Sequence, residues 1–171
     1  MKRFALLIAL IALAASCGDG GKSRPETGPE PNSGGKTELP SGAVLIASDI
    51  VTEVVIRPDP DGDPWEVEKV AGYDGEPLVN SIFSQIYEGS ITVYDYHTGE
   101  PLSQGDVKKI EGEFKNDRTK IGKLSFTEDW YWFPDENRLE KRAKSVTFGY
   151  ELYNNTGKVY AYRAAFRADL N

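Results

Sequence analysis

The residue with the most specific chemistry is Cys17, the single cysteine of the chain. Two basic residues, an apolar run over 4–13 and small residues at 14–16 precede it. This order is typical of a secretory signal peptide, and a cysteine at the cleavage point is typical of a bacterial lipoprotein. We therefore expect removal of residues 1–16 and lipidation of the Cys17 sulfur, which would anchor the protein in a membrane.

A membrane-spanning helix is the alternative for the same segment. The apolar residues 4–15 would form a helix of about 18 Å, which is too short for a hydrocarbon core of about 30 Å. We expect a lipid-anchored protein of the bacterial envelope. Gly18, rather than an aspartate, follows the cysteine and favours the outer membrane, with either face of that membrane open.

Three alternating aspartates, Asp59, Asp61 and Asp63, resemble the first oxygen ligands of a calcium loop. Such a loop needs Gly at its sixth position and Glu at its twelfth, where this chain has Pro64 and Val70. Pro and Gly residues between the aspartates favour a turn. We expect an acidic turn and no metal site.

Two adjacent carboxylates, Glu128 and Asp129, could suggest glycoside hydrolysis, which uses two carboxylates facing one cleft. Neighbouring residues of a strand point to opposite faces, so we expect these two not to converge. With one His and one Cys, the chain has no Cys/His zinc cluster, and its cysteine is expected to be lipidated rather than catalytic. The sequence therefore predicts a non-enzymatic protein without a cofactor.

Four aromatic residues follow these carboxylates. Trp130 and Trp132 share one face of the predicted strand, and Tyr131 and Phe133 share the other. Two Trp rings at this spacing could stack on sugars, but large aromatic residues are usually buried, and we expect the Trp pair in the core. One of the two faces must be covered by something outside these strands, a helix or a partner.

A basic run follows at 138–144. Its simplest interpretation is a solvated strand, and the alternative is contact with an acidic partner or with lipid headgroups. The candidate interaction residues of the chain are Trp130, Trp132, Arg138, Arg142 and Lys144, and the basic run also includes Lys141.

Charge and composition limit the other functions. The 171 residues carry 27 acidic and 20 basic side chains, a formal net charge of −7, which argues against a nucleic-acid partner. Residues 17–40 are rich in Gly and Pro and contain no aromatic residue, so they predict a flexible tether. Residues 41–171 hold nearly all the aromatic residues and predict a single globular domain.

Apolar spacing predicts two helices in this domain. Apolar residues recur with helical spacing over 78–87, after Pro77 and before Gly89. Ser103 and Asp106 resemble a capping box at the start of a second, shorter helix.

Strands are predicted around and after these helices. Residues 91–96 are β-branched and aromatic and end at an exposed turn that contains His97. Alternation predicts three antiparallel strands near 124–132, 146–152 and 160–166, with turns at 134–137 and 154–157. The segment 43–56 leaves helix and strand open. The predicted class is α+β, an antiparallel β-meander with two short helices packed on one face.

The stretch 87–95, which contains Gly89, Ile91, Thr92 and Tyr94, and the later Glu-Asp-Trp at 128–130 resemble the PorN/GldN family. The resemblance runs over residues 77–168. Proteins of that family belong to the type IX secretion and gliding-motility apparatus, where they join a lipoprotein partner in a periplasmic ring. The resemblance implies an envelope protein that works through contacts with other proteins.

Together these patterns predict a lipid-anchored, non-enzymatic envelope protein with a protein partner, which the resemblance places near secretion or motility machinery. The alternative is a glycan-binding lipoprotein that uses the face of Trp130 and Trp132.

Overall fold

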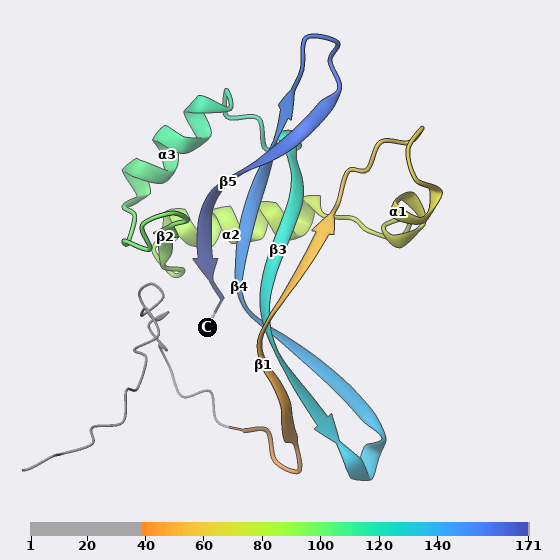
Figure 1. The fold of residues 1–171 in the computed structure, drawn as a ribbon. Helices are drawn as coiled ribbons and strands as arrows, with labels where there is room; N and C mark the ends of the chain where they lie inside the picture. The colour runs from red at the N-terminus through yellow and green to blue at the C-terminus, as the bar shows by residue number, and fades with distance from the viewer. Residues whose placement is uncertain (1–38, 171) are drawn as a thin grey trace, which may run out of the picture. The chain divides into compact units, whose positions relative to one another are not determined.

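The computed structural model describes residues 39–170 (Figure 1). The strands of this part are β1 (Val44–Val55), β2 (Val93–Asp95), β3 (Ile121–Phe133), β4 (Arg138–Tyr153) and β5 (Val159–Asp169). Its α-helices are α1 (Pro64–Lys69), α2 (Glu76–Glu88) and α3 (Gln104–Glu113), and short 3₁₀ helices cover Arg118–Lys120 and Pro134–Glu136. Within residues 39–170, no helix has the length and apolarity needed to cross a bilayer.

All these strands form one antiparallel sheet in the order β1-β3-β4-β5-β2. The strands β3, β4 and β5 follow one another as a meander, so the α+β class predicted from the sequence is confirmed. The segment 43–56, for which helix and strand were both open, supplies the edge strand β1.

Strand β2 is shorter than the predicted strand 91–96. It ends at Asp95, because the Asp95 side chain accepts hydrogen bonds from the backbone N–H groups of His97 and Thr98, each at 2.8 Å. These bonds turn the chain and lower the pKa of the Asp95 carboxyl. His97 lies exposed in that turn, as predicted.

The acidic segment is a turn that leads into the unpredicted helix α1. Asp59 accepts a hydrogen bond from the backbone N–H of Asp61 at 3.0 Å, and Asp63 caps α1 by accepting one from Trp65 N–H at 2.9 Å. Pro64 occupies the first turn of the helix, where its missing N–H costs nothing. Apolar spacing could not reveal α1, because none of its residues is buried.

Helix α2 supplies the centre of the core. Its buried side chains are Val79, Ile82, Phe83 and Ile86. The ring centroid of Phe83 lies 5.3 Å from that of Phe148 on β4 and 5.6 Å from that of Phe166 on β5. Gly89 ends the helix with a φ of 79°, a left-handed conformation that glycine adopts without strain. The predicted helix and both of its boundary signals therefore match the structure.

Helix α3 joins the same core. Ser103 and Asp106 form the predicted capping box, and the following Val107 is fully buried. At the other end of the helix, Phe114 stacks on Tyr150 of β4 with 3.9 Å between ring centroids. Both helices predicted from the sequence thus pack on the sheet.

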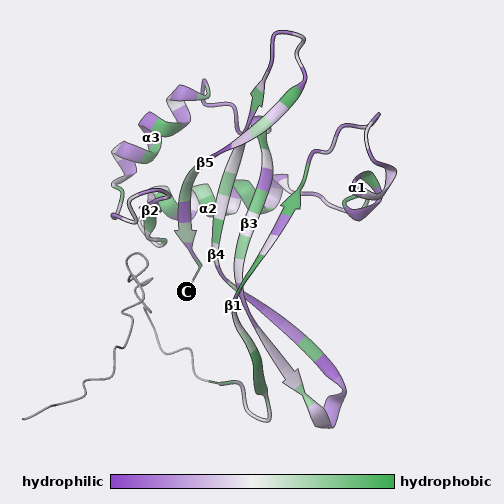
Figure 2. Ribbon diagram, in the orientation of Figure 1, coloured by the Kyte–Doolittle hydropathy of each residue, from purple (hydrophilic) through white to green (hydrophobic). Residues whose placement is uncertain are grey.

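One part of the sheet lies away from this core. In Figure 1 the lower ends of β1, β3 and β4 extend beyond the helices, and we call residues 44–47 and 129–144 the arm. Figure 2 shows that the β1 strand of the arm is hydrophobic. The arm therefore combines apolar side chains with a position outside the core.

The position of Phe83 predicts which residues of α2 carry stability. Phe83→Ala removes a fully buried ring and should lower the free energy of unfolding by about 3–5 kcal/mol. Leu78→Ala, on the same helix but 37% exposed, should change it by less than about 1 kcal/mol. Urea unfolding followed by circular dichroism measures both values, and equal losses would contradict the packing described here.

Candidate functional site

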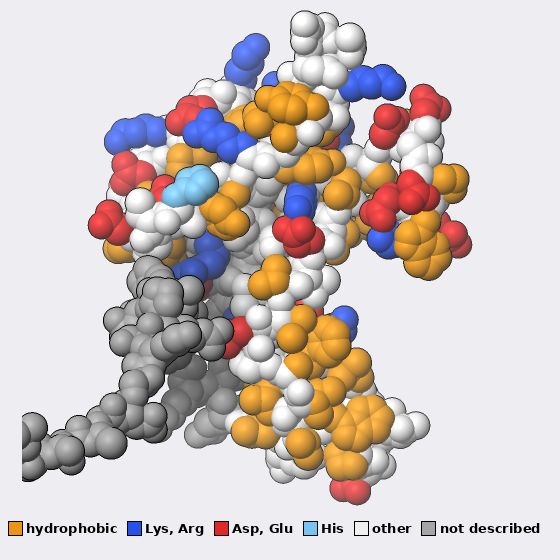
Figure 3. Space-filling view, in the orientation of Figure 1, with side chains coloured by type: hydrophobic (Ala, Val, Ile, Leu, Met, Phe, Trp, Pro, Cys, Tyr) orange, Lys and Arg blue, Asp and Glu red, His pale blue; other side chains and the backbone are white. Residues whose placement is uncertain are grey.

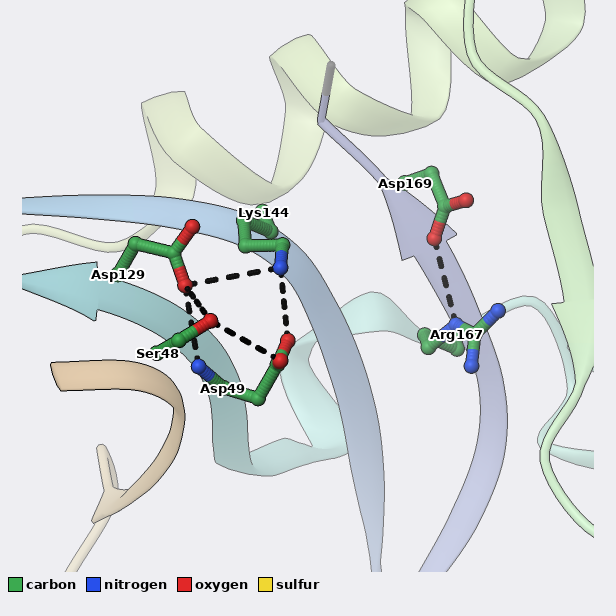
Figure 4. A network of polar contacts seen from close by, with 6 residues as sticks. All are labelled: Ser48, Asp49, Asp129, Lys144, Arg167 and Asp169. Atoms are coloured by element: carbon green, nitrogen blue, oxygen red, sulfur yellow. Dashed lines mark hydrogen bonds and ion pairs between the residues drawn. The ribbon is translucent and has the colours of Figure 1, made fainter. Parts of the chain in front are cut away.

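The arm meets the rest of the sheet at a group of polar residues, shown in Figure 4 and called the junction: Ser48, Asp49, Asp129 and Lys144. The Asp129 side chain, on β3, accepts hydrogen bonds from the Ser48 hydroxyl and the Asp49 backbone N–H, each at 3.0 Å. Lys144 Nζ lies 2.7 Å from the Asp49 carboxylate and 3.5 Å from that of Asp129. Asp129 is 7% exposed, so its charge is held by these partners rather than by water.

Bulges in the two neighbours of β3 create the junction. The register of β1 against β3 shifts between Ala47 and Ile50, and Asp49 has a φ of 56°. The register of β4 against β3 shifts beside Glu128, where Lys144 is the additional residue. Bulges bend a strand and increase its twist, so paired bulges on both sides of β3 redirect the whole arm.

The contact between Lys144 and Asp49 stabilises the charged forms of both side chains. The hydrogen bond from Lys144 lowers the pKa of the Asp49 carboxyl, and the same bond raises the pKa of the Lys144 ammonium. Lys144, an interaction candidate from the sequence, is thus engaged within the fold itself.

The open face of the arm, which we call the tryptophan face, consists of Val44, Ala47, Trp130, Trp132, Leu139 and Lys141. Trp132 pairs with Val44 on one side and with Leu139 on the other, and these two neighbours are 52% and 46% exposed. The indole N–H of Trp130 donates a hydrogen bond to Glu128 at 3.1 Å. Lys141 Nζ lies over the same ring, 4.1 Å from its centroid. Figure 3 shows hydrophobic side chains gathered on this lower end of the molecule.

The expectation that Trp130 and Trp132 belong to the core is wrong. Both are only partly buried, and within residues 39–170 neither belongs to the core cluster or packs against it. The physical reason is the bend at the junction, which carries their strand away from α2 although the apolar alternation of β3 continues.

The opposite face of the arm holds the other aromatic pair. Tyr131 and Phe133 are 3% and 6% exposed, and their rings lie beneath Arg142 and Arg138, at 5.2 and 3.8 Å to the ring centroids. Glu140 binds both guanidinium groups, at 2.7 Å to Arg138 and 2.6 Å to Arg142. These bonds lower the pKa of the Glu140 carboxyl, first through Arg142 and then through Arg138.

The basic run predicted as one patch is therefore divided. Arg138 and Arg142 lie on the face of Tyr131 and Phe133, Lys141 lies on the tryptophan face, and Lys144 lies in the junction. Strand alternation alone separates Lys141 from Arg138 and Arg142, whereas the position of Lys144 depends on the bulge, which the sequence does not show.

A second exposed aromatic surface lies at the other end of the sheet, and we call it the tyrosine surface: Tyr96, Tyr153, Tyr160 and Tyr162. Two of these residues, Tyr96 and Tyr162, line a groove of about 440 Å³, together with Leu152, Lys123, Glu53 and Arg163. Tyr96, Tyr153 and Tyr160 are 52%, 45% and 65% exposed. Hydrophobic and basic side chains gather over β4 and β5 in the upper part of Figure 3.

Local contacts shape the groove. Gly149 forms part of its floor, because a Cβ there would lie 3.1 Å from Cβ of Lys123 and 3.4 Å from Cβ of Tyr162. Lys123 Nζ binds Glu53 at 2.8 Å. Burial and the nearby Glu151 carboxylate raise the pKa of Tyr162, so its hydroxyl stays protonated and can donate a hydrogen bond. Sequence reasoning missed this surface because its tyrosines come from separate segments.

A cleft of about 920 Å³ lies between α2, α3 and the start of β3. Glu111 is 5% exposed. Its carboxylate lies 2.7 Å from Arg118 Nε and accepts a hydrogen bond from the Tyr87 hydroxyl. The Arg118 guanidinium lies 4.1 Å from the ring centroid of Phe83. The buried Glu111 carboxylate is thus bound to the half-buried Arg118 guanidinium, and this ion pair joins α3 to the core.

The adjacent carboxylates do not form a catalytic pair. Glu128 accepts hydrogen bonds from Thr52 at 3.0 Å and from the Trp130 indole, whereas Asp129 is bound in the junction. They point to opposite faces, as predicted for neighbours on a strand. Within residues 39–170, no three metal-binding side chains converge.

Cys17, the predicted lipidation site, and the tether predicted at 17–40 lie outside the described residues, apart from the last two residues of that segment. Comparison of the chain with protein-family models and with curated proteins finds no match to either. The function must therefore be argued from the surfaces themselves.

The junction predicts how the arm responds to mutation and pH. Asp129→Ala leaves the Asp49 N–H without its acceptor and removes one of the two carboxylates beside Lys144, and should cost about 1–3 kcal/mol. Amide hydrogen exchange should accelerate in the arm while α2 stays protected, whereas Asp135→Ala at the exposed turn should leave both unchanged.

The pH dependence follows from the lowered pKa of Asp49. The ionised Asp49 stabilises the arm fully at pH values above 3.8, the ordinary pKa of an aspartate. This stabilisation is lost as the pH falls through the lower pKa that Asp49 has in the folded state. Arm protection should therefore be constant at neutral pH and decline in acid before that of α2. Simultaneous loss in both would contradict a separate junction.

Proposed function

We propose that this protein is a lipid-anchored, non-enzymatic component of the bacterial envelope that works by binding another protein through its tyrosine surface. The observation that carries the proposal is the exposure of Tyr96, Tyr153 and Tyr160, together with a groove that Tyr96 and Tyr162 line. Tyr96 and Tyr160 are more than half exposed, although folding usually buries aromatic rings. Such a surface is stabilised most when a partner covers it.

The chemistry of the groove fits a protein partner. Tyrosine and arginine are enriched at the centres of protein interfaces, because they combine large contact area with hydrogen bonding. Tyr side chains also lose little conformational entropy on binding, since they have only two side-chain torsions. Lys123, Arg163 and Glu53 place both charge signs at the groove, which can select a complementary partner.

The resemblance of residues 77–168 to the PorN/GldN family supports a partner within secretion or motility machinery of the envelope. That resemblance includes β2 and β5, which carry or adjoin Tyr96, Tyr160 and Tyr162. Lipid anchoring through Cys17 would hold the domain where such machinery lies.

Glycan binding by Trp130 and Trp132 is the second candidate, because both rings lie outside the core. Sugars stack on a free aromatic face, and Lys141 already occupies one face of the Trp130 ring. A sugar would have to displace that lysine or use Trp132 alone. This competition ranks glycan binding below protein binding.

A photo-crosslinking residue tests the proposed surface. The substitution Tyr160→p-benzoylphenylalanine, made in the cells that produce the protein, should give a discrete adduct with one envelope protein. The same substitution at Trp65 is the control, because Trp65 is 62% exposed but lies on α1. Adding Tyr96→Ala should reduce the adduct at least about fivefold, as expected for a residue at the centre of an interface.

Two crosslinking results would contradict binding of a protein at the tyrosine surface. Equal adducts from positions 65 and 160 would show non-specific contact. No adduct from positions 96, 153 or 160 would show that the tyrosine surface has no protein partner.

Lipid anchoring is tested separately by metabolic labelling with a radioactive fatty acid. The wild-type chain should incorporate label, and Cys17→Ser should incorporate none, because the thioether cannot form. Ser16→Ala is the matched control and should keep the label, since it leaves a small residue before the cysteine. Label that persists in Cys17→Ser would contradict anchoring at this residue.

A further inference from the structure

The tryptophan face is apolar, open and separate from the tyrosine surface, so the proposed protein contact does not account for it. Val44 and Leu139 are 52% and 46% exposed. Trp132 pairs with Val44 and Leu139, Trp130 pairs with Ala47 and Lys141, and both Trp side chains are only partly buried. We propose that the tryptophan face docks on the surface of the lipid bilayer in which the protein is anchored.

The side chains of this face match the chemistry of a membrane interface. Trp is enriched at the level of lipid headgroups, because its ring is apolar and its N–H is polar. Lys141 has a long apolar stem over Trp130 and an ammonium group that can reach a lipid phosphate. The aliphatic neighbours supply apolar area that water otherwise covers, and burial of that area favours docking.

The path of the chain brings this face to the membrane. The described residues run from Leu39 directly into β1, and its first residue, Val44, belongs to the tryptophan face. Residues 17–40, counted from the predicted lipid attachment site, can span at most about 80 Å. Among the described elements, the arm is thus the one nearest to Cys17 along the chain. This step rests on the lipid anchoring proposed above.

The distribution of charge also favours the arm over the rest of the domain. Residues 44–47 and 129–144 contain four acidic and four basic side chains, so the arm has no net charge. The excess of acidic residues in 39–170 therefore lies outside the arm, much of it in the segment 59–76. An anionic lipid surface repels those acidic parts and leaves the neutral arm as the part that can approach closely.

The edge strand gives a further reason for a lipid rather than a rigid partner. Val44, Leu45 and Ile46 are consecutive, and all three are at least 41% exposed. Consecutive strand residues point to opposite sides, so apolar side chains surround the edge of the arm. A fluid interface can cover both sides of an edge at once, without a matching shape.

Vesicle binding tests the proposal on a chain that carries no lipid. The protein starts at residue 17 and carries Cys17→Ser, and the vesicles contain phosphatidylethanolamine and phosphatidylglycerol in a ratio of about 3:1. The protein should float with these vesicles, and lipids brominated near the headgroup should quench its tryptophan fluorescence. Replacement of one docking side chain should weaken the partition coefficient about tenfold.

Three variants separate docking from folding. Trp132→Ala and Leu139→Asp should each weaken flotation, and Leu139→Asp keeps the fold because its side chain is 46% exposed. Trp65→Ala removes a more exposed tryptophan from α1 and should leave flotation unchanged. Circular dichroism confirms that each variant is folded before its binding is compared.

Several outcomes would overturn the proposal. The parent chain could stay unbound at every lipid concentration, or Trp65→Ala could lose as much binding as Trp132→Ala. Dimerisation or glycan binding that disappears in Leu139→Asp, without any vesicle binding, would assign the face to a second copy or to a sugar. Because the test protein has no lipid, a failure of Cys17 labelling contradicts the anchor alone, and a failure of flotation contradicts the docking alone.

Discussion

The buried carboxylate of Asp129 is the interaction on which the shape of this protein depends. It accepts hydrogen bonds from the Ser48 hydroxyl and the Asp49 N–H and lies 3.5 Å from Lys144 Nζ. An uncompensated carboxylate at that depth would cost several kcal/mol, so the chain must bring donors to it from both sides. The bulges in β1 and β4 do so, and the bend they produce separates the arm from the core.

This bend divides one sheet into two parts with different partners. On one side, α2 and α3 cover the sheet and bury Phe83, Phe148 and Phe166 around a single centre. On the other, the arm keeps its own aromatic residues outside that core and leaves the tryptophan face open. Exposed aromatic area on both the arm and the tyrosine surface is costly in water, and this cost is the physical basis for assigning a binding role to the protein.

Sequence reasoning succeeded where a single element determines its own pattern. The stripe of α2, its stop at Gly89 and the capping box of Ser103 are local signals, and the structure contains all three. It failed for Trp130 and Trp132 because the apolar alternation of β3 runs on through the bend without a change. The extra residues of the bulges lie in β1 and β4, so the sequence of β3 alone does not indicate the bend.

The same limit applies to the polar contacts. Glu111 and Arg118 are seven residues apart and meet only because the chain turns after α3, so their ion pair has no helical spacing to reveal it. The tyrosine surface joins Tyr96 to residues of β4 and β5 that follow more than fifty positions later. Sequence could identify such residues as exposed or charged, but only the fold shows which of them meet.

The distance between the arm and the core tests this account most directly. Spin labels can be attached at Asp135→Cys in the arm turn and Ser84→Cys on the exposed side of α2, in a chain that carries Cys17→Ser. Pulsed electron paramagnetic resonance should give a single narrow distribution of the distance between the two spin labels in the parent chain, and a broad distribution after Asp129→Ala. A distribution that stays narrow without Asp129, or is broad with it, would contradict the claim that this carboxylate holds the arm.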